Sequence, residues 1–100
     1  MRLILIKPRP GVRLKAALDR KRKRLEKHGG TFRLDGRDKW VHRQYLGWIN
    51  LRRGPHGFVV AKTNTKVPEA EWGILSSFVS FLDRHFRDQI DWITIQYETL

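Results

Sequence analysis

Histidines that stand close to arginines are the residues of this chain best suited to chemistry on a phosphate group. The sequence contains four histidines, scattered along its length: His28, His42, His56 and His85. His42 is followed by Arg43, and His56 comes shortly after Arg52 and Arg53. An imidazole can move a proton at a phosphodiester while a guanidinium stabilises the charge that develops. A small metal-independent RNase, similar to toxin nucleases, is therefore one hypothesis for the function.

Other chemistries lack the residue patterns that they need. The chain has no cysteine, which excludes disulfides, thiolate metal sites and a cysteine nucleophile. It has no HExxH, no GxSxG and no glycine spacing typical of nucleotide binding. We expect no metal site and no cofactor, and the patterns single out no catalytic residue. A binding protein is favoured over an enzyme.

The positive charge of the chain is concentrated in its first half. Residues 1–53 carry 17 Lys and Arg against 4 Asp and Glu, a net charge of +13. Residues 54–100 carry 4 Lys and Arg against 6 Asp and Glu, a net charge of −2, so the whole chain carries +11. A field of this sign attracts nucleic acid, an anionic membrane or an acidic protein.

The densest basic run, residues 20–24, falls on a segment with helical periodicity. Cations spread along a helix match a phosphate backbone, and the loop 7–11 adds cations near the positive end of this helix. We therefore expect electrostatic binding of nucleic acid, RNA slightly ahead of DNA, with little sequence specificity. The cations expected to take part are Lys7, Arg9, Arg13, Arg20, Arg22, Lys23, Arg24, Lys27, Arg43, Arg52 and Arg53.

Aromatic residues alternate with cations through the middle of the chain. Trp40 and Trp48 are stacking candidates, because exposed aromatic rings flanked by cations bind single-stranded bases. On the other face of a sheet the same tryptophans would be core residues, and the sequence leaves both alternatives open. A module that dimerises through a Trp40/Trp48 patch, or through a free edge strand at Tyr97, is a further hypothesis.

Short apolar or alternating runs bounded by turn residues predict the strands. They are residues 3–6, 31–34, 39–43, 45–51, 58–62 and 91–97. The runs 39–43 and 45–51 form either one long bent strand or two short ones, with Gly47 as a candidate bulge. The strict alternation of 91–97 is typical of a half-buried strand that closes a sheet.

Two segments have the periodicity of amphipathic helices. Residues 12–27 place three leucines on one face, with Lys21 inside the apolar stripe. The second helix runs from Pro68 to about residue 87 and must cover a large apolar surface. Its apolar half consists of Trp72, Ile74, Leu75, Phe78, Val79, Phe81, Leu82 and Phe86.

The order of elements, β-α-β-β-(β)-α-β, predicts an α+β fold in one domain that spans residues 1–100. We expect a two-layer sandwich, ferredoxin-like in outline, with both helices on one face of a mostly antiparallel sheet of four to five strands. No apolar run approaches the ~20 residues of a transmembrane helix, so we expect no membrane partner and a cytoplasmic location. A homodimer and an acidic protein partner stay open as alternatives to nucleic acid.

Overall fold

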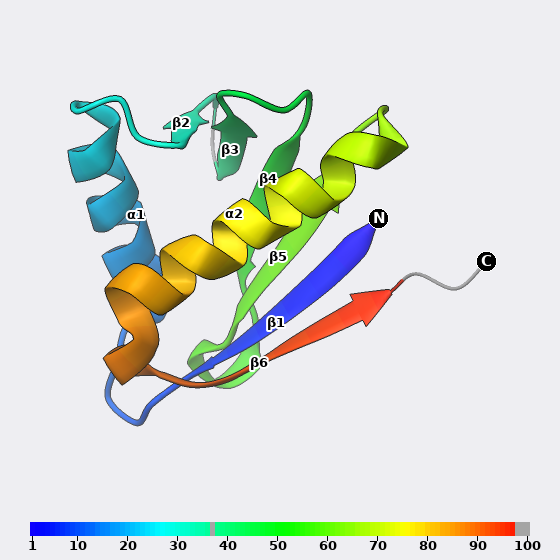
Figure 1. The fold of residues 1–100 in the computed structure, drawn as a ribbon. Coiled ribbons are helices and arrows are strands. Elements are labelled where there is room, and N and C mark those ends of the chain that lie inside the picture. The colour runs from blue at the N-terminus through cyan, green and yellow to red at the C-terminus, as the bar shows by residue number, and fades with distance from the viewer. Residues whose placement is uncertain (37, 98–100) are drawn as a thin grey trace.

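A single antiparallel sheet carries two helices on one face in the computed structural model, which describes residues 1–36 and 38–97 (Figure 1). The helices are α1 (Leu14–Glu26) and α2 (Pro68–Phe86), and two 3₁₀ turns, η1 (Pro55–Gly57) and η2 (Arg87–Gln89), precede the last two strands. The strands are β1 (Arg2–Pro8), β2 (Phe32–Leu34), β3 (Lys39–His42), β4 (Trp48–Arg53), β5 (Val59–Asn64) and β6 (Ile90–Tyr97). Their order in the sheet is β2-β3-β4-β5-β1-β6, so the first strand of the chain lies between the last two.

The α+β class and the antiparallel sheet confirm the prediction from sequence, whereas the expected count of four to five strands is wrong. The sheet has six strands because the segment 39–51 forms two of them, β3 and β4. The buried imidazole of His42 accepts hydrogen bonds from the backbone N–H groups of Gln44 (3.0 Å) and Tyr45 (3.2 Å). These bonds hold the loop in which the chain reverses between β3 and β4. β2, which precedes β3 in the chain, pairs with β3 as a further short strand.

The core lies between the sheet and the two helices. Alternate residues of each strand point into it, as the two-residue period of a strand requires, and Ile4 and Ile6 are fully buried. Trp40 and Phe78 are the largest fully buried side chains, and their rings meet edge to face with centroids 5.9 Å apart. Such a pair contributes about 0.5–1.5 kcal/mol beyond the area that it buries. Because both helices pack on this face, no described helix covers the other face of the sheet.

α2 crosses in front of the sheet (Figure 1) and supplies the larger part of the helical core. It begins at Pro68, whose fixed φ suits the first helical position. Its buried residues are Ala70, Ile74, Leu75, Phe78, Leu82 and Phe86. Trp72, in contrast, is 65% exposed, so its predicted place in the buried half of the helix is wrong. It lies about 90° from the centre of the apolar stripe, where a side chain is not enclosed between helix and sheet.

α1 has few apolar residues and buries charged side chains instead. Lys15 and Arg22 are both buried. Lys15 Nζ lies 2.7 Å from a carboxylate oxygen of Asp19 and 2.8 Å from one of Asp38, which ties the helix to the β2–β3 turn. Burial lowers the pKa of Lys15, but the two carboxylates outweigh it and raise the pKa above its usual value. The amine therefore stays charged inside the protein.

Gly47 lets the β3–β4 loop approach α2 closely. A Cβ atom at this position would lie 2.5 Å from the backbone oxygen of Asn64 and 2.5 Å from Cδ1 of Ile74, and φ is +154°. Gly47→Ala should destabilise the fold by about 3 kcal/mol, because packed backbone has to move to admit the methyl group. Urea denaturation followed by tryptophan fluorescence measures the loss in the free energy of unfolding.

Gly11→Ala is the matched control for this substitution. Gly11 has a φ of +81° but no atom within 4 Å of an added Cβ, so the substitution brings backbone strain without a clash. It should cost only about 1 kcal/mol. Equal losses in the two variants would contradict the close approach at Gly47.

Candidate nucleic-acid interface

The uncovered face of the sheet presents its side chains in rows. In an antiparallel sheet, directly paired residues point to the same side. One row of side chains therefore runs across five strands, because β3 pairs with β4, β4 with β5, β5 with β1 and β1 with β6. This row consists of Lys39, Asn50, Lys62, Leu3 and Gln96. Four of its five side chains are polar, and two of them are cations.

Further rows lie on both sides of this polar row. Arg33, Val41 and Trp48 form the row on one side, and Arg52, Val60, Leu5 and Thr94 form the row on the other. Lys7 and Trp92 are paired beyond the last row, and the ring of Phe58 contacts that of Trp92. We call the surface made by these residues the open face.

Two aromatic groups lie at opposite ends of the open face. Trp48 is half-buried, and Lys39 Nζ lies 4.1 Å from the centroid of its ring. Trp92 is 40% exposed and meets Phe58 edge to face at 5.4 Å. From the spacing of strands and residues, roughly 20–25 Å separates Trp48 from Trp92. The open face therefore offers two platforms for flat rings with polar side chains between them.

A hollow of about 420 Å³ lies on the open face between these platforms. Leu3 and Val60 give it an apolar lining, and Asn50, Lys62 and Gln96 add polar groups. A side-chain amide both donates and accepts hydrogen bonds, and an ammonium group only donates them. The hollow thus suits a flat group that carries hydrogen-bonding atoms at its edge, such as a nucleobase.

Acidic side chains are scarce on the open face. In the described part of the chain, Asp91 pairs with Lys7 at 2.9 Å and Asp35 lies 3.8 Å from Lys39 Nζ, both at the margins. The hydrogen bond from Lys7, together with its charge, lowers the pKa of Asp91. The cations of the open face with no carboxylate partner among the described residues are Arg33, Arg52 and Lys62.

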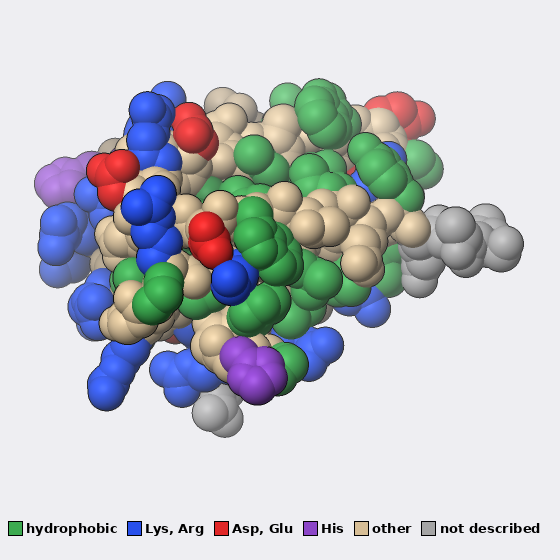
Figure 2. Space-filling model, turned by 90° about the horizontal axis from the view of Figure 1, so that it is seen from below, with side chains coloured by type: hydrophobic (Ala, Val, Ile, Leu, Met, Phe, Trp, Pro, Cys, Tyr) green, Lys and Arg blue, Asp and Glu red, His purple; other side chains and the backbone are tan. Residues whose placement is uncertain are grey.

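A second basic surface lies on the outer side of α1. Figure 2 shows lysine and arginine side chains concentrated on the left, the side on which α1 stands in Figure 1. Four of the predicted cations line a shallow hollow there together with a histidine, and we call this group the α1 surface: Arg20, Lys23, Arg24, Lys27 and His28. All five are exposed, so the structure brings together the greater part of the predicted basic run.

Lys21 and Arg22 of that run do not line the hollow, and the prediction of Arg22 as a nucleic-acid contact is wrong. The side chain of Arg22 is only 5% exposed, it is ion-paired with Glu26, and its guanidinium carbon lies 5.8 Å from the ring centroid of Trp40. Residues 18, 22 and 25 share one face of a helix, so Arg22 takes an inward position on the side of Leu18.

Trp40 is fully buried, which excludes it as a stacking platform, whereas Trp48 lies on the open face. The register explains the difference. Trp40 pairs with Ile49, which points into the core, while Trp48 pairs with Val41, which points away from the helices. The sequence left open whether each tryptophan is a core residue or a stacking platform. The structure makes Trp40 a core residue and leaves Trp48 on the open face. A Trp40/Trp48 patch for dimerisation does not form.

Two more of the predicted cations, Lys7 and Arg52, lie on the open face. Arg53 directly follows Arg52, and successive residues of a strand point to opposite sides of the sheet. Arg53 instead lines a shallow hollow with Arg13 at the start of α1. The predicted set is thus divided between the two sides of the sheet.

Arg9 and Arg43 lie apart from these groups. Arg9 is exposed after β1, and its Nε donates to the backbone oxygen of Ile90 at 3.4 Å. Arg43 is exposed in the loop that follows β3. Neither lines the hollow of the open face or that of the α1 surface. The predicted cations therefore do not form one continuous site.

His42 holds a loop and is not placed for chemistry on a substrate. Besides accepting from two backbone N–H groups at Nδ1, it shares a 2.9 Å hydrogen bond between Nε2 and the hydroxyl of Ser77. Burial lowers the pKa of His42, and the two bonds to Nδ1 select the tautomer with the proton on Nε2. Of the two histidines proposed for an RNase, only His56 is exposed, at the tip of η1.

Sequence reasoning missed four residues of the open face: Asn50, Lys62, Trp92 and Gln96. The signal that could have found them is the strand period, which separates Lys62 and Trp92 from their core-facing neighbours. That period does not say which strands are adjacent. The row of polar side chains therefore becomes visible only once all six strands are paired.

Metal-binding clusters, membrane-spanning helices and similar proteins give no further information on this interface. Within residues 1–36 and 38–97, no three His, Asp or Glu side chains are grouped so that they could hold a metal ion. Neither described helix is long and apolar enough to cross a lipid bilayer. No protein-family model, curated protein or solved structure matches the chain.

His42→Ala should destabilise the fold by about 2–3 kcal/mol, because it leaves two backbone N–H groups of the β3–β4 loop without acceptors. In the unaltered protein the pKa of His42 is lowered. The contribution of this side chain to the free energy of unfolding is therefore complete above the pKa that histidine has in the unfolded chain, and it is lost as the pH falls below that value. The stability gap between the two proteins should therefore narrow below about pH 6.5. Urea denaturation at several pH values measures the gap.

His28→Ala serves as the control, since His28 is exposed on the α1 surface. It should change the free energy of unfolding by no more than about 0.5 kcal/mol. A His42→Ala variant as stable as this control would contradict the structural role of His42.

Proposed function

We propose that this protein binds single-stranded nucleic acid, RNA ahead of DNA, through the open face of its sheet. One observation carries the proposal: the open face combines the aromatic rings of Trp48 and Trp92 with cations that no described carboxylate neutralises. Base stacking on an aromatic side chain contributes about 1–3 kcal/mol per base, whatever the base. The cations between the rings then track the phosphates of the strand.

The shape of the open face favours a single strand over a duplex. The major groove of B-DNA admits a helix or a two-stranded ribbon, which are narrower than a sheet of six strands. Bases can also stack on Trp48 and Trp92 only when they are not stacked in a duplex. The amides of Asn50 and Gln96 and the amine of Lys62 reach base edges or the 2′-hydroxyl, the group that distinguishes RNA from DNA.

The α1 surface adds long-range attraction rather than specificity. Its exposed cations lie on the helix side of the molecule, and the chain as a whole carries +11. Such a field raises the rate of encounter with a polyanion and is screened by salt. Because the α1 surface contributes charge and the open face contributes base stacking, binding has little sequence preference.

A second candidate, dimerisation through β6, is favoured by the shape of that strand. β6 is an edge strand of eight residues whose outer side pairs with no described residue, and Tyr97 near its end is 61% exposed. From Trp92 to Tyr97 it has no charge and no proline, the usual protections of an edge. Sedimentation at high salt separates this candidate from nucleic-acid binding, because a dimer joined by backbone hydrogen bonds persists there.

We also propose a ferredoxin-like outline for the fold and a cytoplasmic location for the protein. The order β4-β5-β1-β6, with α1 and α2 in the connections, supports a ferredoxin-like outline to which β2 and β3 are added as a hairpin. The lack of cysteine suits a cytoplasmic location.

Trp48→Ala and Trp92→Ala should each weaken binding to short single-stranded RNA about 5- to 150-fold, because each removes one stacking platform. Fluorescence anisotropy of a labelled oligonucleotide measures the change in Kd. Trp48→Phe should recover most of the affinity, since a phenyl ring still stacks. Trp72→Ala is the matched control, because Trp72 is exposed on α2, away from the open face. Equal weakening in the Trp72 and Trp48 variants would contradict the assigned face.

Lys62→Glu should weaken binding to single-stranded RNA at least tenfold, because it reverses a central charge of the open face. Lys66→Glu is the matched control, because it changes an exposed lysine outside the open face. For about six phosphate contacts, the logarithm of the binding constant should fall against the logarithm of salt concentration with a slope of about −4 to −5. Titrations at several salt concentrations give both the loss of affinity and the slope. Binding that is insensitive to salt, or equal losses in the two variants, would overturn the proposal.

A further inference from the structure

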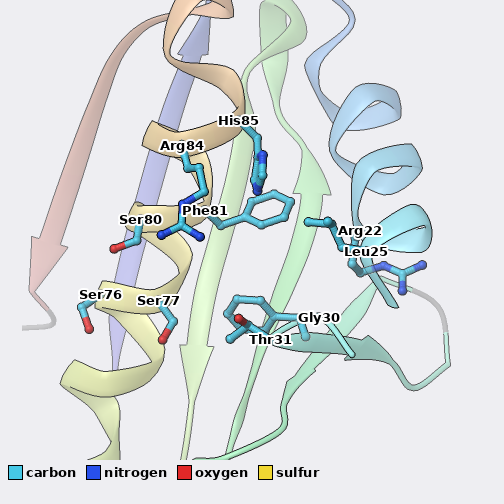
Figure 3. Close-up of a pocket in the computed structure, with 11 residues that line it drawn as sticks. Arg22, Leu25, Gly30, Thr31, Ser76, Ser77, Ser80, Phe81, Arg84 and His85 are labelled. Carbon is cyan, nitrogen blue, oxygen red and sulfur yellow. The ribbon is translucent and has the colours of Figure 1, made fainter. Parts of the chain in front are cut away.

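A pocket of about 400 Å³ lies between α1 and α2, on the side of the sheet opposite the open face (Figure 3). A stripe of α2 forms one wall, the last turns of α1 form another, and the connector before β2 lines one end. In Figure 3 the ring of Phe81 lies in the middle, with Arg84 and His85 at one end and Thr31 at the other. The volume falls in the lower part of the range for small-molecule sites.

Several polar side chains of this pocket have no hydrogen-bond partner among the described residues. Arg84, His85, Ser80 and Thr31 make no side-chain hydrogen bond to any described residue, although all four line the same pocket. Ser77 differs, because its hydroxyl is already bonded to His42. The pocket thus gathers a guanidinium, an imidazole and two hydroxyl groups that are free to bind a ligand.

The charge around the pocket is positive and largely uncompensated. Burial lowers the pKa of His85, and the charges of Lys21 and Arg84 lower it further. Arg84 lines the pocket, whereas Lys21 lies outside its lining. Neither cation has a carboxylate partner in the described ranges. Arg22, in the facing wall, is ion-paired with Glu26, but its Nε is buried without an acceptor.

We propose that this pocket binds a phosphate monoester, through Arg84 and His85. The guanidinium of Arg84, next to an imidazole that gains a proton when an anion binds, suits a dianion better than a carboxylate, which carries one charge. A guanidinium offers paired N–H donors to phosphate oxygens, and the hydroxyls of Ser80 and Thr31 supply further donors. The ring of Phe81 gives an apolar surface for the organic part of the ester.

The monoester has two sources: a free nucleotide, or the terminal phosphate of a nucleic-acid strand. An internal phosphodiester carries one negative charge and continues in both directions, so it suits the extended open face better than a compact pocket. This inference is independent of the proposed function, because the pocket and the open face share no residue.

NMR titration of the full chain tests the proposal with inorganic phosphate and with adenosine 5′-monophosphate as probes. The expected result is saturable shifts at Thr31, Ser80 and His85, together with a rise in the pKa of His85 as the dianion binds. Arg84→Gln should weaken binding at least tenfold, the effect of losing a charge-assisted hydrogen bond. Arg87→Gln is the matched control, since Arg87 is exposed on the next turn, is paired with Asp83 and does not line the pocket.

A 5′-phosphorylated oligonucleotide and its 5′-hydroxyl counterpart distinguish the two sources. Shifts in the pocket with the phosphorylated strand alone assign the site to strand ends, and shifts with the mononucleotide alone assign it to a free nucleotide. Either result supports a monoester site. The absence of saturable shifts at His85, or equal weakening by Arg84→Gln and Arg87→Gln, would overturn the proposal, because the binding would then reflect the general positive field.

Discussion

The pairing of β1 with both β5 and β6 sets the arrangement of the whole molecule. β1 directs Ile4 and Ile6 into the core, where both are fully buried. A slip of one residue in either pairing would turn these side chains outward, at a cost of about 1.5–3 kcal/mol for each. The same register aligns Leu3 with Lys62 on one side and with Gln96 on the other. The polar row of the open face therefore follows from the packing on the opposite face.

α2 is tied to the strands beneath it by one largely buried carboxylate. Arg2 Nη1 lies 2.8 Å from Glu71 Oε1, and the hydroxyl of Thr63 donates to the same oxygen at 3.2 Å. Burial raises the pKa of Glu71, but hydrogen bonds from the amino group of Met1 and from Thr63, with the charge of Arg2, outweigh burial and lower it. The ionised form thus stabilises the fold near neutral pH, and this contribution is lost as the pH falls through the folded-state pKa.

The sheet separates two positively charged regions that suit different ligands. The open face is extended and carries aromatic rings about 20–25 Å apart, which fits a strand with one charge per phosphate. The pocket between the helices is compact and is lined by Arg84 and His85 beside the ring of Phe81, which fits a single group of higher charge. The fold distributes the excess of Lys and Arg among these two regions and the α1 surface.

The sequence by itself determined the α+β class, the two helices, the extents of α2 and β6 and the positive field, because these depend on local periodicity and composition. The tertiary structure decided which residues face the solvent. Trp40 and Trp48 have similar neighbours along the chain, yet register buries one and leaves the other on the open face. Arg22 belongs to the basic run, yet the packing of α1 turns it inward. The open face and the pocket each join residues from distant segments, and such contacts arise only when the strands pair and the helices pack.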